Sequence, residues 1–314
     1  MRPSAIGRRL VSGVLVLVGV SILAFSLVHL LPGDSANAIA GEFASPDQIE
    51  NVRTQLGLDK PIVVQYFTWL TSVLHGDFGT SLWTSRPAKD MVLDAVPATL
   101  SIALVSLLIS TVLGLFFGTI AALRRGSWVD RGVTFCAGLG ISMPAFWVLL
   151  ILFVPLSILN RWFPAVGYAP LSAGFWPWLS HILLPATALA VAHAAELSRF
   201  TRGAVMDVLS TPYIRASRSR GASGWRLVRT HVLRNAAIPV VTVFGLQIGN
   251  MLGGVIVVET VAGINGLGLL AVNAILNRDF VLVQAYVLFT AAVVVVINIL
   301  VDLLYSAINP KVRA

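Results

Sequence analysis

Long apolar runs alternate with short polar segments along almost the whole chain. The first run, residues 10–31, contains 22 uncharged residues and follows Arg2, Arg8 and Arg9. A basic start before an apolar run is also typical of a secretory signal peptide, but the apolar core of such a peptide has only about 7–15 residues. About 20 apolar residues span a bilayer as a helix, so the pattern favours a retained first membrane helix.

Five further apolar runs of similar length follow, and each is expected to form a membrane span. They cover residues 97–123, 133–159, 181–195 with an amphipathic continuation to 208, 238–258 and 281–301. Pro144 and Pro155 predict kinks in the third span, and Gly114 and Gly118 predict close helix packing by the second. The pattern therefore predicts an all-α integral membrane protein with six transmembrane helices.

Residues 32–96 form the longest polar segment, with eight acids and four bases. Ser45 and Pro46 are typical of a helix start, and this helix is expected to end near Gly57. Residues 61–74 are expected to form an amphipathic helix near the membrane surface. The segment would be a small lobe that either docks a partner or covers the spans.

The distribution of basic residues predicts the orientation of the spans. If the polar segments alternate across the membrane, one set holds 16 of the 22 Lys and Arg residues and the other set holds six. Basic residues gather on the cytoplasmic side, so both termini and the loop at 209–238 are expected in the cytoplasm. The predicted organisation is an N-terminus with the first helix at 1–31, an extracytoplasmic lobe at 32–96, and a five-helix core domain at 97–314.

Composition agrees with a membrane protein and excludes most catalytic classes. Hydrophobic residues make up 57% of the chain and charged residues 11%, with a mean hydropathy of +0.85, whereas soluble domains are about a quarter charged. The sequence contains no G-x-x-x-x-G-K-[ST], H-E-x-x-H or G-x-S-x-G motif, and its single Cys136 forms no metal motif. A membrane-embedded enzyme is therefore disfavoured, no metal is assigned to His29 or His193, and any energy for transport must come from a partner.

The most basic stretch lies at residues 210–239, between two apolar runs. It contains six arginines between Arg215 and Arg234 and no acidic residue. Gly221 would permit a tight turn between two short helical segments, which favours a docking element. The alternative is a solvated loop that lies on anionic lipid.

Several motifs give the chain a resemblance to a known family. In the basic stretch, Arg215-Ala216-Ser217 stands where the family has Glu-Ala-Ala, Gly221 follows at the expected spacing, and Arg234 to Pro239 resembles the ending of the signature. Further matches are Leu31-Pro32-Gly33-Asp34, Leu56 to Pro61, Gly76-Asp77-Phe78-Gly79-Thr80-Ser81, Pro97 to Leu100, Arg124 to Ser127, Val258-Glu259-Thr260, Gly266-Leu267-Gly268 and Val301 to Tyr305. Arg215 reverses the charge of the signature, and Ala262 to Asn265 replaces an aromatic stretch that is usual before Gly-Leu-Gly. The chain resembles permease subunits of binding-protein-dependent ABC importers, in the dipeptide/oligopeptide (DppB/OppB-like) branch.

The resemblance implies a type I ABC importer permease fold with cytoplasmic coupling helices in a bacterial inner membrane. The chain would form half of a translocation path for di- or oligopeptides and would work by alternating access. Its partners would be a homologous second permease, two ATP-binding subunits or one fused ATPase, and an extracytoplasmic substrate-binding protein. ATP and Mg would bind on the ATPase subunits, and this chain would bind no cofactor and no nucleic acid. Alternatives are nickel, glycoside or haem import by the same fold, and a passive channel, which is disfavoured because no filter motif is apparent.

The resemblance and the residue pattern together assign candidate site residues. The residues assigned to ATPase coupling are Tyr213, Arg215, Ala216, Ser217, Arg218, Gly221, Ala222, Trp225 and Arg226. Candidates for the translocation path or gate are Glu196, Glu259, Thr260 and Asn298, and candidates for helix packing are Gly245, Gly249 and Gly253.

Three of the path candidates have a plainer explanation. Glu196 is favoured as the partner of Arg199 in an i,i+3 ion pair. Glu259 and Thr260 could simply cap the fifth span. Asp302 is expected to make a structural contact with the coupling region.

Overall fold

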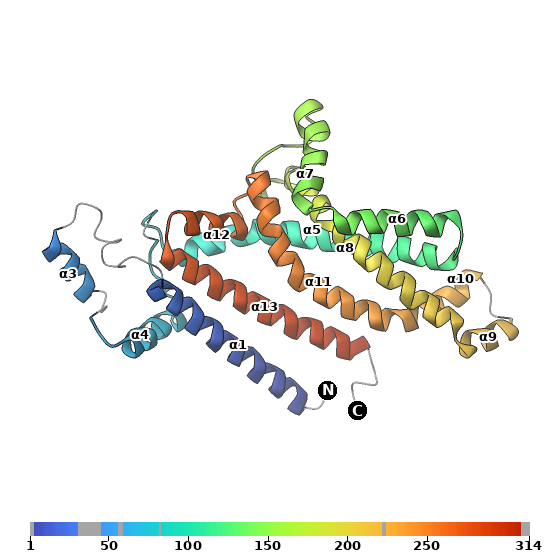
Figure 1. Cartoon of the computed structure of the whole chain (residues 1–314), viewed down its shortest axis with the longest axis horizontal. Coiled ribbons are helices and arrows are strands. Elements are labelled where there is room, and N and C mark those ends of the chain that lie inside the picture. The colour runs from blue at the N-terminus through green and yellow to red at the C-terminus, as the bar shows by residue number, and fades with distance from the viewer. Residues whose placement is uncertain (1–2, 31–44, 56–58, 82, 222–223, 309–314) are drawn as a thin grey trace. The chain divides into compact units, whose positions relative to one another are not determined.

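The computed structural model describes residues 3–30, 45–55, 59–81, 83–221 and 224–308 (Figure 1). Regular structure in these ranges is helical, apart from one isolated β-bridge between Thr80 and Pro87. The α-helices are α1 (Pro3–Leu30), α3 (Pro46–Gln55), α4 (Ile62–Leu74), α5 (Ala88–Leu123), α6 (Trp128–Ser142), α7 (Ala145–Phe153), α8 (Phe175–Ser210), α9 (Pro212–Ser219), α10 (Gly224–Leu227), α11 (Leu233–Ala262), α12 (Leu267–Leu276) and α13 (Phe280–Ile308). Two π-helices, η1 (Val154–Leu159) and η3 (Val228–Val232), and one 3-10 turn, η2 (Leu171–Ala173), complete the set. The prediction of an all-helical protein is confirmed.

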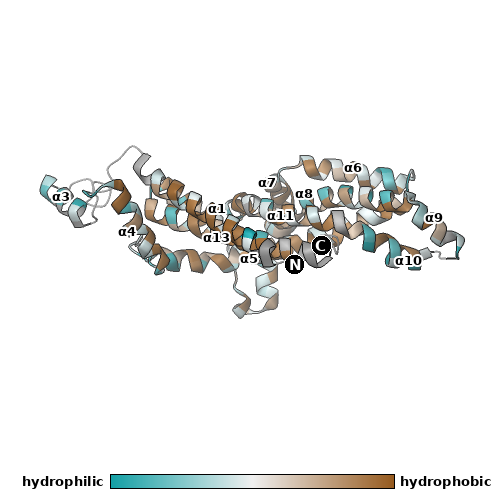
Figure 2. Cartoon of the chain, turned by 90° about the horizontal axis from the view of Figure 1, so that it is seen from below, coloured by the Kyte–Doolittle hydropathy of each residue, from teal (hydrophilic) through white to brown (hydrophobic). Residues whose placement is uncertain are grey.

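Four described helices are long and apolar enough to cross a membrane: Gly7–Ser26, Ala88–Leu123, Phe175–Ser210 and Phe280–Val301. Three bent helix pairs raise the number to as many as seven if each pair is one span. Figure 2 shows hydrophobic residues along these long helices, and hydrophilic residues on the short α3 and α9. The expected total of six spans lies within this range and stays a prediction.

The chain divides into two compact units. The first contains Pro97–Leu269 with Ile297–Ala314, and the second contains Pro3–Val96 with Leu270–Val296. The first unit has a core in which Ile102 of α5, Leu149 of α7, Ile182 and Leu189 of α8, and Ile264 are all buried. This unit carries the candidate site residues described below.

The packing of α5 on α8 depends on two glycines of α5. A β-carbon at Gly114 would lie 2.7 Å from Leu197 Cβ, and one at Gly118 would lie 2.5 Å from the Ser198 carbonyl oxygen. Distances below 3.0 Å do not occur for real β-carbons, so only glycine permits this approach. The predicted packing role of both residues is confirmed.

The other predicted packing glycines lie on α11, and only one of them is confirmed. A β-carbon at Gly245 would collide with Val301 of α13, but Gly249 and Gly253 have nothing within 4 Å of that position. Gly254 makes the contact instead, because its β-carbon would lie 2.7 Å from Leu189 Cδ1. The packing role expected for Gly249 and Gly253 stays a prediction, because helical spacing reports a shared face and not which neighbour covers that face.

The third expected span is a sharply bent pair and not a kinked helix. Helices α6 and α7 are inclined by 102°, and α7 leaves the direction of α6 in Figure 1. Met143 before Pro144 has the extended angles φ −87° and ψ 122°, since proline disfavours the α region for the residue that precedes it. At Pro155 the chain continues as the π-helix η1.

Two expected boundaries also move. The second span begins at Ala88 and continues through Pro97 in one helix of 36 residues. Helix α8 begins at Phe175, before the expected start of the fourth span at residue 181. Between the expected fifth and sixth spans, the chain forms a further apolar helix, α12.

The second unit confirms the amphipathic helix expected at 61–74. Helix α4 packs on α1, where Tyr66 Oη lies 2.8 Å from Ser21 Oγ and the Phe25 ring lies 5.5 Å from the rings of Tyr66 and Trp69. Helix α3 confirms the other expected helix of this segment, which begins at Pro46. The Leu31-Pro32-Gly33-Asp34 motif lies outside the described residues.

The Gly76 to Ser81 motif forms a turn in the same unit. Gly76 and Gly79 have φ values of +84° and +83°, which L side chains rarely adopt. The turn directs Ser81 Oγ to donate a hydrogen bond to Asp279, whose other oxygen accepts from the Leu282 amide at the start of α13.

Candidate functional site

The basic stretch folds into two short helical segments joined by a turn. After α8 ends at Ser210, helix α9 covers Pro212–Ser219, and α10 with η3 covers residues 224–232 before α11 begins. Gly221 between them has φ +87°, a left-handed conformation that favours glycine. Nothing lies within 4 Å of where its β-carbon would be. The predicted turn is confirmed, and its requirement for glycine comes from the backbone and not from lack of space.

One face of this segment anchors it to the spans. Ile214, Leu227 and Val232 are buried, and they pack with Ala122 of α5 and Val205 of α8. Full burial of an Ile, Leu or Val side chain contributes roughly 1.5–3 kcal/mol to stability. The two short helices therefore have a fixed apolar underside.

The opposite face is exposed and basic. Tyr213, Arg215, Ala216 and Arg226 are exposed, and the Tyr213 hydroxyl lies 2.6 Å from His231 Nδ1. Ser217 is 4% exposed, so it is not part of this exposed face, and its role in coupling stays a prediction. Ala222 and the side chains of Arg218 and Trp225 lie outside the described residues. Five of the nine assigned residues thus remain candidates for an exposed docking face, including Gly221.

An ion pair that the sequence did not reveal joins α6 to α8. Arg202 of α8 binds Asp130 of α6 through two bonds, Nε to Oδ1 at 2.6 Å and Nη2 to Oδ2 at 3.0 Å. Gly126 N also donates to Asp130, which is 4% exposed. The one signal in the sequence was that Asp130 is the only acid in the basic loop 124–131.

Glu259 lies in a buried polar cluster at the junction of α11 and α12. Its side chain is 0% exposed. One oxygen accepts a bond of 2.6 Å from Thr99 Oγ1 of α5, and the other accepts from the amides of Gly268 at 2.7 Å and Leu269 at 3.2 Å. Thr99 Oγ1 in turn accepts a bond of 2.8 Å from the Leu267 amide. The first three amides of α12 are thereby satisfied, and a carboxylate at a helix N-terminus also interacts favourably with the helix dipole.

This geometry explains two motifs that the sequence left separate. A β-carbon at Gly266 or Gly268 would collide with the Glu259 carboxyl group. Gly266-Leu267-Gly268 is therefore the motif that lets Glu259 reach the start of α12. The structure gives Glu259 a capping contact on α12 and not on its own span. Thr260 is exposed, and its hydroxyl donates a hydrogen bond to Ile256 O of its own helix. A role of either residue in a gate stays a prediction.

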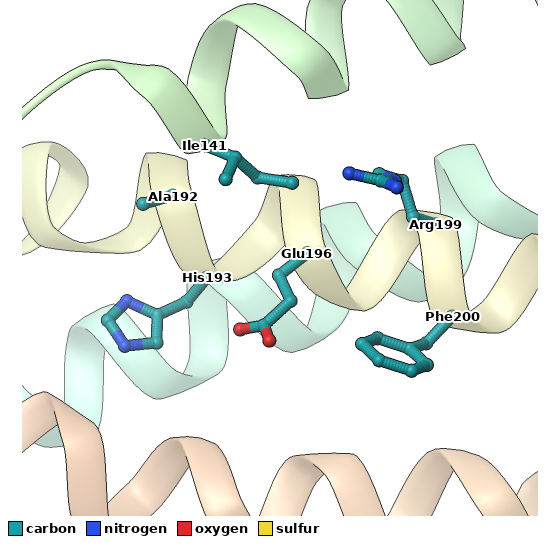
Figure 3. Close-up of a pocket in the computed structure, with 6 residues that line it drawn as sticks. All are labelled: Ile141, Ala192, His193, Glu196, Arg199 and Phe200. Carbon is teal, nitrogen blue, oxygen red and sulfur yellow. The ribbon is translucent and has the colours of Figure 1, made fainter.

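Glu196 lies in a cavity of about 560 Å³ beside α8 (Figure 3). Its Oε2 accepts a bond of 3.0 Å from Gln247 Nε2 of α11. The ion pair predicted with Arg199 is not formed between these two described residues, and Figure 3 shows Arg199 directed away from the Glu196 carboxylate. The spacing prediction was wrong because the polar side chain of α11 competes for the same carboxylate. The cavity is lined by Ile141, Ala192, His193, Glu196, Arg199 and Phe200.

The remaining candidates are less constrained. Asn298 of α13 is exposed, and the side chains of Asp302 and His29 lie outside the described residues. The described residues contain no group of three or more His, Cys, Asp or Glu side chains that could hold a metal ion.

Taken together, the long apolar helices and the anchored basic segment between α8 and α11 indicate a membrane component that meets a water-soluble partner. Residues 114–314 match the family described as binding-protein-dependent transport system inner membrane component, and residues 4–103 match the N-terminal family of the same membrane components. The chain belongs to this family of inner-membrane transport components.

Two curated relatives cover nearly the whole chain. A probable peptide ABC transporter permease protein of Sinorhizobium fredii is 39% identical over 306 residues, which is 98% of each chain. A glutathione transport system permease protein of Salmonella typhi is 42% identical over 306 residues, covering 98% of this chain and 97% of the relative. The identification as an ABC importer permease, expected from the motifs, is confirmed.

One solved structure is similar in fold. It is an inward-facing form of the MetNI methionine ABC transporter, matched with a TM-score of 0.54 and 20% identity over 70% of this chain and 96% of the other. This similarity confirms a permease-like helical fold.

Proposed function

We propose that the chain is the transmembrane subunit of an ATP-driven importer of di- or oligopeptides and forms one half of its translocation path. The support for the peptide substrate is the printed function of its relatives, one a probable peptide permease and one a glutathione permease. Glutathione is itself a small peptide, so the two names describe one chemical class. Nickel, glycoside and haem import have no such support.

The observation that carries the coupling mechanism is the two-faced segment α9–α10. Its apolar face is anchored to α5, α8 and α11, and its basic face is exposed. A soluble ATPase that binds the exposed face would transmit its movement to the three anchored helices. The full importer would contain a second, homologous permease, two ATP-binding subunits or one fused ATPase that hold ATP and Mg, and an extracytoplasmic binding protein that delivers peptide.

The topology proposed for this importer has six spans with both termini in the cytoplasm. The excess of basic residues in the termini and in the loop 209–238 supports it. A reporter fused after Pro310 should be active only in the cytoplasm. Activity only outside the cell would contradict the orientation without affecting the assignment to the family.

The coupling role is tested at Gly221. Gly221→Arg should insert and assemble normally but should abolish peptide-stimulated ATP hydrolysis in proteoliposomes that contain the whole importer. The matched control is Gly221→Asn, because asparagine tolerates a positive φ and should retain most of the stimulated activity. Normal uptake by Gly221→Arg would refute the proposal.

A further inference from the structure

The side of the cavity that carries His193 and Glu196 presents hydrogen-bond acceptors, whereas the guanidinium of Arg199, which also lines the cavity, is directed away from the Glu196 carboxylate (Figure 3). The two N–H donors of the Gln247 amide are both used, one by Glu196 Oε2 and one by the His193 carbonyl oxygen, each at 3.0 Å. The Gln247 side chain is 1% exposed, and its Oε1 has no partner within the described part of the chain. This orientation of the amide is fixed, because exchanging its N and O atoms would place an acceptor against two acceptors.

His193 adds another acceptor. Its Nδ1 lies 2.9 Å from the Leu189 carbonyl oxygen, and a carbonyl only accepts, so Nδ1 carries a proton. In the neutral ring, Nε2 is then an acceptor. Figure 3 shows the His193 ring and the Glu196 carboxylate extending from α8 toward the same side.

Two acceptors on this side of the cavity are left over. Glu196 Oε1 and His193 Nε2 have no hydrogen-bond partner among the residues that the structure describes. Ionisable residues inside membrane helices are costly and mark candidate sites of function. A positively charged group with several N–H donors would complement these two acceptors, and the cavity volume of about 560 Å³ lies in the range of small-molecule sites.

We propose that this cavity is a cargo subsite in which Glu196 and His193 bind the protonated amino terminus of a peptide. An ammonium group offers three donors and a positive charge, and a free amino terminus is charged at neutral pH because its pKa is about 7.7–8.0. The side chain of Phe200, which lines the cavity on the same side of α8 as Glu196 (Figure 3), would contact the apolar part of the first residue. This subsite rests on the proposed function in peptide import.

The test compares two forms of one peptide in proteoliposomes that contain the complete importer and its binding protein. Uptake is measured for a tripeptide and for its N-acetylated form, which lacks the charge. The binding protein has its own preference, but it is the same protein in every assay, so its preference cancels when variants are compared by the uptake ratio. Wild-type importer should favour the free amine.

Glu196→Gln should reduce this ratio about tenfold, because it removes a charge-assisted hydrogen bond, mainly through a higher KM for the free-amine peptide. Glu196→Asp should restore part of the preference. The matched control is Asp207→Asn, which removes one negative charge from an exposed site on the same helix and should leave the ratio unchanged. An unchanged ratio in a Glu196→Gln importer that assembles and hydrolyses ATP would overturn the subsite.

Arg199→Gln separates the subsite from a simple ion pair. If the cargo amine binds Glu196, removal of this guanidinium should maintain or increase the preference for the free amine. A loss of preference equal to that of Glu196→Gln would instead assign the carboxylate to Arg199 and would overturn the proposal. Failure of the wild-type importer to take up either peptide would refute the proposed function, a result distinct from both.

Discussion

Two carboxylates in the first unit, Glu259 and Glu196, lie on apolar helices but have opposite surroundings. Glu259 is fully buried and accepts bonds from a hydroxyl and two amides. Glu196 accepts one bond, from Gln247, and faces a cavity. A carboxylate whose bonds are all supplied by the chain stabilises a junction, whereas one left with an unfilled acceptor is available to a ligand.

The largest effect is expected when the buried carboxylate of Glu259 is removed. Glu259→Ala would leave the Thr99 hydroxyl and the amides of Gly268 and Leu269 without an acceptor, and each buried unpaired donor costs about 1–3 kcal/mol. We expect a loss of about 3 kcal/mol in stability, measured as a lower melting temperature and poor assembly in detergent. Glu259→Gln keeps an acceptor oxygen and should lose less; equal stability of Glu259→Ala and wild type would show that the cluster is not structural.

A smaller effect is expected from the partner side of the same cluster. Thr99→Val keeps the shape of the side chain but removes the donor to Glu259 and the acceptor for the Leu267 amide. We expect about 2 kcal/mol of destabilisation, with the peptide uptake ratio unchanged. The matched control is Thr111→Val, because Thr111 bonds only within its own helix.

Glu196→Gln should give the opposite result to Glu259→Ala. Its effect should appear in the uptake ratio, about tenfold, while the melting temperature stays close to that of wild type, since glutamine can still accept from Gln247. A large loss of stability with an unchanged ratio would place Glu196 in the same class as Glu259 and would end the contrast between them.

The smallest effect is expected at Gln247. Gln247→Leu removes the bond to Glu196 but also removes the unpaired Oε1, so the two consequences for stability should partly cancel. We expect about 1 kcal/mol of destabilisation or less and a fall of the uptake ratio by roughly threefold, since Glu196 loses the bond that orients it. A fall as large as that of Glu196→Gln would show that orientation by Gln247 decides recognition.

Much of the fold could be predicted because membrane helices have a strong local signal. The apolar runs located α1, α5, α8 and α13, and the positions of Gly114 and Gly118 predicted close packing of α5, although not that α8 is its partner. The third expected span was predicted less accurately, because the 102° bend at Met143 depends on how α7 packs in the core. The fifth expected span, residues 238–258, is shorter than the helix α11 that contains it. A proline marks a possible bend, but its angle comes from neighbouring helices.

The candidate site was predictable only in part. Charge and spacing located the α9–α10 segment and its turn at Gly221, because an amphipathic helix shows its two faces in its own sequence. They paired Glu196 with Arg199, whereas Glu196 accepts its hydrogen bond from Gln247. Asp130 and Gln247 were not identified, because each gains its meaning from a partner on another helix, Arg202 and Glu196 respectively.

The sequence by itself determined that the chain enters a membrane and that its basic residues are concentrated at 210–239. Those two properties depend on composition and local order, which hydrophobic and charged side chains express directly. The resemblance to importer permeases came from motifs shared with a known family. Only the tertiary structure decided that Glu259 meets Thr99 across 160 positions and that Gln247 meets Glu196 across 51. Helical periodicity states which residues share a face, but the face that each helix presents to its neighbours follows from packing of the whole unit.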